Sequence, residues 1–161
     1  MGYEIERKFL VNGDYKSHAF RSYIIRQGYL SISGLSVIRI RTKGDSAYIT
    51  IKSAEVEGML KRHEWEYEIP VADAEEMLLL CEDAVIDKTR YLVQAGKHTF
   101  EVDEFYGENE GLLIAEVELE SEDETFEKPD WLGSEVTGNV RYYNSFLSIK
   151  PYKEWSNEMN E

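Results

Sequence analysis

Apolar and polar residues alternate with a period of two along most of the chain, as they do in β-strands with one apolar and one polar face. In the first such segment, residues 3–11, the side chains of Glu4, Glu6 and Lys8 share one face and Ile5 lies on the other. The same alternation returns in further segments, at residues 23–32, 36–41, 48–52, 62–70, 85–93, 98–105 and 112–120. The pattern therefore predicts about eight strands, and the turn-forming residues between several of them favour hairpin connections.

Two segments break this alternation and carry a helical spacing instead. Residues 73–81 begin with an acidic stretch that resembles a capping box, and apolar side chains follow on one side. Residues 141–149 form the second candidate helix, with Thr137 or Asn139 as its cap. The acidic segment 121–129 between the last strand and this helix is expected to be a loop with a short helix.

About eight antiparallel strands are enough to close into a barrel, which removes the edges of the sheet and leaves room for a small ligand. The expected fold is therefore α+β and mainly antiparallel β: a closed eight-stranded β-barrel tunnel with a few flanking helices. A length of 161 residues fits a single domain. We expect that domain to span residues 1–150 and to be followed by an exposed C-terminal tail at residues 151–161.

Charged residues on the predicted strands separate by sign from one strand to the next. The acidic groups are Glu4/Glu6, Glu64/Glu66/Glu68 and Glu116/Glu118/Glu120, and the basic groups are Arg39/Arg41 and Lys88/Arg90. Like charges two residues apart lie about 6.6–7 Å apart along a strand, so their repulsion needs counter-charges or a ligand. A solvated outer face would explain the alternation on any one strand. The separation by sign across the strands favours a charged interior.

The opposite faces of these strands carry apolar side chains: Ile5, Val37, Ile49, Ile51, Trp65, Tyr67, Val117 and Leu119. If the charges line the interior, this apolar face lies outside and is covered by helices or by a partner. A homodimer is compatible with such a face, and so are covering helices. Placing many charges inside is costly, and the binding of a charged ligand would offset that cost.

The chain as a whole is strongly acidic, with 32 Asp and Glu against 18 Lys and Arg and a net charge of −14. Such a charge repels nucleic acid and anionic membranes, so we expect neither as a partner. A free triphosphate is repelled as well, so a site for it needs locally concentrated positive charge together with metal. The first residues lack the features of a signal peptide, no apolar stretch approaches the length of a membrane span, and the lone Cys81 cannot form an internal disulfide. A cytoplasmic location is expected.

The segment Glu4-Ile5-Glu6-Arg7-Lys8 matches the ExExK signature that opens the CYTH superfamily, the triphosphate tunnel metalloenzymes. The chain resembles this family because further motifs follow in the family's order: Arg39-Ile40-Arg41, Tyr48-Ile49-Thr50-Ile51-Lys52, Glu64-Trp65-Glu66-Tyr67-Glu68, Lys88-Thr89-Arg90-Tyr91, Glu101-Val102-Asp103-Glu104-Phe105 and Ala115-Glu116-Val117-Glu118-Leu119-Glu120. The resemblance covers about residues 3–149, and the run at residues 141–145 is similar to the compact bacterial branch.

The resemblance implies a tunnel that hydrolyses a linear triphosphate, inorganic tripolyphosphate or a nucleoside triphosphate, with Mg²⁺ or Mn²⁺. Phosphates would be bound by Arg39, Arg41, Lys52, Lys88, Arg90 and Arg141. The metal would be held by hard carboxylate oxygens, from Glu4, Glu6, Glu116, Glu118 and Glu120. The leaving phosphate would be stabilised by Lys8, Lys88 or Arg90. Glu64, Glu66 and Asp103 would either join the metal ligands or pair with interior arginines.

Several alternatives stay open at this point. Class IV adenylate cyclases share the tunnel and the signature, although the sequence shows no clear motif for binding adenine, and thiamine triphosphate is a further substrate to consider. A non-catalytic polyphosphate-binding module would keep the basic residues and lose the metal carboxylates, whereas this chain has both. The C-terminal helix either plugs one mouth of the tunnel, with Arg141 facing phosphate, or covers the barrel. His63 and His98 are out of phase with the neighbouring acidic residues and are expected outside.

Overall fold

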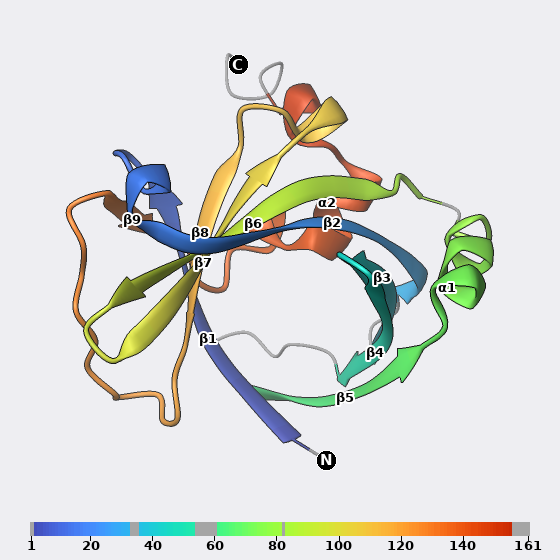
Figure 1. Cartoon of the computed structure of the whole chain (residues 1–161), viewed down its shortest axis with the longest axis horizontal. Coiled ribbons are helices and arrows are strands. Elements are labelled where there is room, and N and C mark those ends of the chain that lie inside the picture. The colour runs from blue at the N-terminus through green and yellow to red at the C-terminus, as the bar shows by residue number, and fades with distance from the viewer. Residues whose placement is uncertain (1, 33–35, 54–60, 82, 156–161) are drawn as a thin grey trace.

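A computed structural model describes residues 2–32, 36–53, 61–81 and 83–155 of the chain. They form a single antiparallel sheet of nine strands with two α-helices and four short 3₁₀ turns (Figure 1). The strands are β1 (Gly2–Val11), β2 (Ala19–Ile32), β3 (Ser36–Lys43), β4 (Ser46–Ser53), β5 (Lys61–Ile69), β6 (Ile86–Ala95), β7 (His98–Phe105), β8 (Leu113–Glu118) and β9 (Leu132–Glu135). The helices are α1 (Val71–Leu78) and α2 (Asn144–Ile149), and the 3₁₀ turns are η1 (Lys16–His18), η2 (Gly107–Asn109), η3 (Val140–Tyr142) and η4 (Tyr152–Glu154).

The prediction of a mainly antiparallel β fold is confirmed, and each of the eight predicted segments contains a strand. The ninth strand, β9, was not predicted. Its four residues, Leu-Gly-Ser-Glu, are too few to show an alternation, and the strand forms because it pairs with β1 at Phe9↔Glu135 and Val11↔Leu132. The short helix expected within residues 121–129 is absent from that described segment, which contains turns and extended chain instead.

Strand order along the sheet is β5-β4-β3-β2-β6-β7-β8-β1-β9. β1 pairs with β8, where Glu6 lies opposite Glu118 and Lys8 opposite Glu116. β1 also pairs with β5, from Gly2↔Glu64 to Ile5↔Lys61, although these two strands stand far apart in the strand order. Figure 1 shows the strands curving around a common centre, with α1 on the side of β3 and α2 near the middle.

The apolar outer face of the sheet is covered by parts of this same chain. Over β1, β7 and β8 the cover is the irregular segment 121–131, whose Phe126 and Trp131 rings both pack edge-to-face on Phe100. Over β3 and β4 the cover is α1, which buries Ile40 together with Leu78. The expected outer cover is therefore present, and a loop supplies a large share of it.

One residue of the predicted outer face lies elsewhere, and another lies on that face but is exposed. Val37 has the same strand phase as Arg39, and it lines the charged interior cavity described below. The other, Tyr67, is 62% exposed and has no apolar cover. His98 lies on the outer face as expected, where the covering loop buries it: its ring packs edge-to-face on Phe126 and its ring nitrogen hydrogen-bonds to Glu124.

The helices are capped differently from what the sequence predicted. α1 begins at Val71 after Pro70, with no hydrogen bond from a capping side chain, so the capping-box prediction is wrong. The side chain of Asn139 does act as a cap, but its Oδ1 accepts from the backbone N of Arg141 and caps η3 instead of α2. No helix in the described ranges is both long and apolar enough to cross a membrane.

The prediction of an exposed C-terminal tail is wrong for Pro151 and Trp155, which are both buried. Trp155 is 2% exposed and packs edge-to-face against Tyr142 and Tyr152, with ring centroids 5.3 and 5.2 Å away. Its indole N–H donates to the carbonyl oxygen of Lys150. A large aromatic side chain near the end of the chain thus anchors the segment that follows α2, while residues 156–161 lie outside the described part.

Candidate functional site

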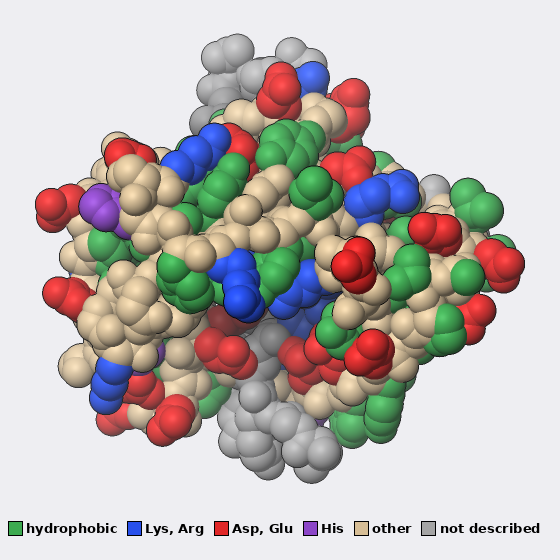
Figure 2. Space-filling model, viewed as in Figure 1, with side chains coloured by type: hydrophobic (Ala, Val, Ile, Leu, Met, Phe, Trp, Pro, Cys, Tyr) green, Lys and Arg blue, Asp and Glu red, His purple; other side chains and the backbone are tan. Residues whose placement is uncertain are grey.

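The curved sheet surrounds a charged cavity of about 250 Å³. Its basic lining residues are Lys8, Arg39, Arg41, Lys43, Lys52, Arg62 and Arg90, and its acidic ones are Glu6, Glu64, Glu66, Glu101, Glu116 and Glu118. Tyr143, Asn144 and Ser145, at the start of α2, lie along the same cavity. Figure 2 shows blue and red side chains facing each other around the hollowed centre of the molecule.

Seven basic side chains therefore meet in one cavity of a chain whose net charge is −14. The period of a strand produces this arrangement, because residues two apart point to the same face. On β3 that face carries Arg39, Arg41 and Lys43, and on β1 it carries Glu6 and Lys8. The local concentration of positive charge that a triphosphate site requires is present.

Carboxylates and one lysine form the part of the cavity wall where β1 meets β8. Lys8 Nζ lies 2.8 Å from Glu116 Oε1 and 3.6 Å from Glu6 Oε1. Burial works against the charge of Lys8, but Glu116 and Glu6 outweigh it and raise its pKa. Burial opposes ionisation of Glu116 as well, yet Lys8 and Arg90 hold the pKa of Glu116 well below its ordinary value. Both groups are therefore charged at neutral pH.

Glu6 and Glu118 lie directly opposite each other on β1 and β8, and both line the cavity. Like charges facing each other across two strands repel and destabilise the pairing unless a cation lies near them. Lys8 supplies part of that positive charge. Two opposed carboxylates beside Glu116, all with hard oxygen donors, fit a small divalent cation. Within the described residues, no set of three or more His, Cys, Asp or Glu side chains already stands in a metal-holding arrangement.

On β7, the strand next to β8, Asp103 holds two cations of β6. Its carboxylate accepts two hydrogen bonds from Arg90, at 2.8 and 2.9 Å, and a third from Lys88 at 2.7 Å. Although burial opposes ionisation, Arg90 and Lys88 lower the pKa of Asp103 to about 2. Burial also lowers the pKa of Lys88 to about 7, with Arg90 and Arg41 adding to the effect and Asp103 opposing it. The bidentate pair fixes the plane of the Arg90 guanidinium, which faces the cavity.

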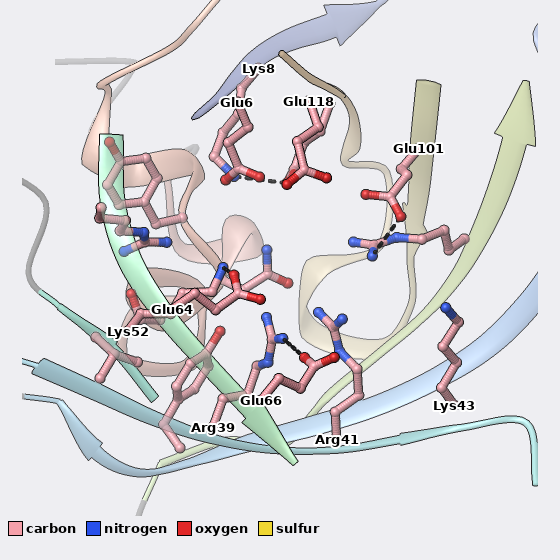
Figure 3. Close-up of a pocket in the computed structure, with 18 residues that line it drawn as sticks. Glu6, Lys8, Arg39, Arg41, Lys43, Lys52, Glu64, Glu66, Glu101 and Glu118 are labelled. Atoms are coloured by element: carbon pink, nitrogen blue, oxygen red, sulfur yellow. Dashed lines mark hydrogen bonds and ion pairs between the residues drawn. The ribbon is translucent and has the colours of Figure 1, made fainter. Parts of the chain in front are cut away.

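Two other cavity cations, on β3 and β4, are paired with carboxylates of β5 (Figure 3). Arg39 Nη2 lies 3.6 Å from Glu66 Oε2, and Thr50 Oγ1 accepts from Arg39 and donates to Glu66. Lys52 Nζ lies 3.5 Å from Glu64 Oε2. These pairs hold the basic side chains extended into the cavity, where an anion can meet them.

The structure brings together eight of the residues predicted for the site along one cavity: Glu6, Lys8, Arg39, Arg41, Lys52, Arg90, Glu116 and Glu118. Lys88 is fully buried and does not line the cavity. Glu120 is exposed and lies two residues beyond the end of β8, where its backbone N donates to Glu124 Oε1. Arg141 lies outside the cavity lining, with its Cζ 5.0 Å from the centre of the Trp155 ring. The side chain of Glu4 lies outside the described part.

Asp103 and Glu66 take the second role foreseen for them, as partners of interior arginines. Sequence reasoning missed Lys43 and Arg62, which continue the phases of Arg39/Arg41 and of Glu64/Glu66 and could have been found by extending those alternations. It also missed Tyr143 and Asn144, for which the sequence carries no comparable signal.

A curved antiparallel sheet that gathers seven cations and a carboxylate cluster around one small cavity fits the class of proteins that bind a compact, highly charged anion together with a metal ion. The chain belongs to the CYTH domain family, whose model matches residues 2–144.

Two curated relatives and one solved structure indicate which kind of CYTH protein this chain resembles. A relative from Acetivibrio thermocellus named inorganic triphosphatase is 51% identical over 157 residues, covering 96% of this chain and 99% of the relative. An inorganic triphosphatase from Nitrosomonas europaea is 39% identical over 153 residues, covering 91% and 97%. A crystal structure of an inorganic triphosphatase matches with a TM-score of 0.67 and 34% identity, covering 92% of this chain and 96% of that one.

Proposed function

We propose that this chain is an inorganic triphosphatase that hydrolyses a phosphoanhydride bond of linear tripolyphosphate in the charged cavity. The observation that carries the proposal is the gathering of cations and carboxylates in one cavity, in a chain that is 51% identical to a protein named inorganic triphosphatase. A linear triphosphate is small and multiply charged, so it matches a cavity of about 250 Å³ lined by seven basic side chains.

The cavity is proposed to be the lumen of a closed tunnel. The pairing of β1 with β5 supports closure, because it joins two strands that are distant in the strand order and leaves β9 as an additional short strand on β1. Closure would remove the edges of the sheet and would exclude much of the bulk water from the bound anion. Charges in such an enclosure act on a phosphate more strongly than exposed charges do.

Phosphate binding is assigned to the cations of β3, β4 and β6: Arg39, Arg41, Lys52 and Arg90. Each arginine offers a planar set of N–H donors that fits phosphate oxygens, and the lysine offers a compact point charge. Lys8 is placed to stabilise the leaving phosphate from the carboxylate side of the cavity. Lys88 is fully buried, so we assign it to the support of Arg90 through their shared partner Asp103.

Metal binding is assigned to the carboxylates at the junction of β1 and β8: Glu6, Glu116 and Glu118. Glu4 and Glu120 stay predicted ligands. A bound Mg²⁺ or Mn²⁺ would neutralise charge on the phosphates and favour attack by water. The three carboxylates would supply the negative charge that holds the ion, and Lys8 keeps Glu116 ionised.

The choice between a hydrolase and its rivals is tested by product analysis. Purified protein is incubated with Mg²⁺ or Mn²⁺ and either tripolyphosphate, ATP or thiamine triphosphate, and the products are separated. The proposal expects the highest kcat/KM with tripolyphosphate and orthophosphate among the products. Cyclic AMP and pyrophosphate from ATP would assign the chain to the cyclases instead, and tight binding without turnover would indicate a binding module.

A cytoplasmic location and a homodimer stay predictions. The cover that segment 121–131 and α1 give to the outer face reduces the apolar surface on which the homodimer was predicted. Size-exclusion chromatography with light scattering measures the oligomeric state directly.

A further inference from the structure

Gln27 on β2 is a completely buried polar side chain, with an exposed fraction of 0%; it does not itself line the cavity, but it contacts residues that do. Its amide makes three hydrogen bonds. The Oε1 atom accepts from Arg41 Nε at 2.9 Å, while Nε2 donates to Tyr29 Oη at 3.2 Å and to Asn144 Oδ1 at 3.1 Å. Both amide hydrogens and the amide oxygen are therefore in use.

The orientation of the Gln27 amide is dictated by its neighbours. Arg41 Nε can only donate, so the atom of Gln27 that faces it must be the oxygen. On the other side, Asn144 Oδ1 also accepts from Lys88 Nζ at 3.0 Å, which identifies that Asn144 atom as an oxygen as well. Gln27 therefore directs a neutral oxygen at Arg41 and its N–H groups at Asn144 and Tyr29.

Arg41 differs from four other cavity cations in the partner that it has. Those four are paired with carboxylates: Lys8 with Glu116, Arg39 with Glu66, Lys52 with Glu64, and Arg90 with Asp103. In the described part of the chain, no carboxylate forms an ion pair with Arg41, and its hydrogen-bond partner is the uncharged oxygen of Gln27.

The Arg41 side chain is partly buried, and a partly buried guanidinium without a counter-charge is costly; an anion that binds beside it relieves that cost. Burial, together with Arg39 and Arg90, lowers the pKa of Arg41, while Tyr29 and Asp103 act in the opposite direction. Because Nε is occupied by Gln27, the donors left to Arg41 are its two Nη groups. Figure 3 shows the guanidinium end of Arg41 pointing into the cavity, between Arg39 and Lys43 along β3.

We propose that Gln27 is a positioning residue that sets phosphate affinity: it orients Arg41 with a neutral oxygen, so that the guanidinium keeps its charge and both Nη groups for a phosphate. The inference rests on the proposed function, since tripolyphosphate is the anion concerned. A glutamate of the same shape would also orient Arg41, but it would neutralise the charge on which phosphate binding depends. The neutral amide at residue 27 thus serves ligand binding more than folding.

The substitution Gln27→Glu tests this inference, because it adds a carboxylate with almost no change in volume. The KM for tripolyphosphate is expected to rise about tenfold or more, while kcat stays within about threefold of the wild type. Calorimetric titration with tripolyphosphate in EDTA is expected to show binding weakened by a similar factor. The thermal midpoint is recorded alongside, because the new carboxylate can pair with Arg41 but loses the two N–H donations to Tyr29 and Asn144. A lowered midpoint with wild-type KM and wild-type binding would mark a residue with only a structural role.

Gln94→Glu is the matched control, because it makes the same change at an exposed position of β6 outside the charged cavity. It is expected to leave KM unchanged. If Gln27→Glu does not fold, Gln27→Met carries the test: it keeps the volume and frees Arg41 to turn away, so KM is again expected to rise.

Wild-type KM and wild-type binding in Gln27→Glu would overturn the inference, as would an unchanged KM in Gln27→Met. These outcomes would leave the proposed function standing, because the wild type would still bind and hydrolyse tripolyphosphate. A wild-type protein that neither binds nor hydrolyses tripolyphosphate would overturn the proposed function and this inference with it.

Discussion

Lys8 is the basic residue that lies among the carboxylates of the cavity. Its Nζ lies between Glu116 and Glu6, and the Tyr143 ring at the start of α2 lies 5.3 Å away. A lysine among carboxylates reduces their mutual repulsion while the metal is absent, and it keeps a positive charge next to the phosphates when the metal is bound. Under the proposed function, the same three charged residues would therefore contribute both to the stability of the cavity and to its chemistry.

Glu6→Gln is the substitution that tests the metal assignment at this scale. The amide removes one negative charge from the pair of opposed carboxylates, so metal-dependent turnover is expected to fall at least about 10–100-fold, the range known for residues one shell further from a metal. Activity is measured against Mg²⁺ and Mn²⁺ concentration. Glu68→Gln is the control, since Glu68 is exposed on β5 and does not line the cavity. Wild-type turnover in Glu6→Gln would contradict the assignment.

At this scale, some of the site could be predicted from the sequence. Residues two apart on one strand share a face, which identified Glu6 with Lys8, Arg39 with Arg41, and Glu116 with Glu118. The burial of Lys88 and the network around Gln27 could not be predicted, because they depend on how β2, β3, β6 and α2 approach one another. That approach is a property of pairing between strands that are distant in the chain.

At the scale of elements, the sequence predicted the strands that carry a long alternation of polar and apolar residues. It did not predict elements that form only because another strand or side chain packs against them. The eight predicted strand segments carry their own pattern, so the sequence alone identifies them. β9 has four residues and depends on the edge of β1, and the anchoring of the final segment depends on Trp155 filling a cluster with Tyr142 and Tyr152. Local pattern carries no signal for such contacts.

The packing of α1 on β2 yields a second prediction, which concerns stability. A Cβ on Gly28 would meet Cys81 Sγ at 2.6 Å and Leu78 Cδ2 at 3.3 Å, so this glycine lets the end of the helix lie against the strand. Gly28→Ala is expected to destabilise the protein by about 1–3 kcal/mol through overpacking. Adding Cys81→Ala removes the closest atom and is expected to restore part of the loss, which a double-mutant cycle from urea unfolding would measure. Strictly additive effects would contradict this contact.

At the scale of the whole molecule, the distribution of charge matters more than its sum. The chain carries a net charge of −14, yet seven of its 18 basic residues line one cavity. An acidic exterior repels free anions, and a cavity with concentrated cations and metal reverses that repulsion only at the site. Binding of tripolyphosphate is therefore expected to depend on salt and on metal, which is consistent with the proposed function.

Asp103 links this charge distribution to stability across pH. Because the pKa of Asp103 is lowered to about 2 from an ordinary value of 3.8, its ionisation contributes stability above the ordinary value, and this contribution is lost as the pH falls from about 4 to 2. Asp103→Asn is expected to cost about 3–5 kcal/mol at pH 7, since it leaves Lys88 and Arg90 buried without their shared carboxylate. Its loss of stability between pH 4 and pH 2 is expected to be smaller than that of the wild type.

Urea unfolding at pH 7 and at steps between pH 4 and pH 2 measures both effects. Asp45→Asn, in the exposed turn between β3 and β4, is the control and is expected to change stability by less than about 0.5 kcal/mol. An Asp103→Asn variant as stable as the wild type at pH 7 would contradict the buried role assigned to this carboxylate.

The central claim is that the charged cavity hydrolyses tripolyphosphate with the help of a divalent metal. The most direct measurement is a time course of the products from tripolyphosphate, resolved by ion chromatography, with Mg²⁺ or Mn²⁺ and in parallel with EDTA. Equal amounts of orthophosphate and pyrophosphate are expected in the presence of metal, and no turnover is expected in EDTA. Intact tripolyphosphate in the presence of metal, or equal turnover with and without it, would contradict metal-dependent hydrolysis in this cavity.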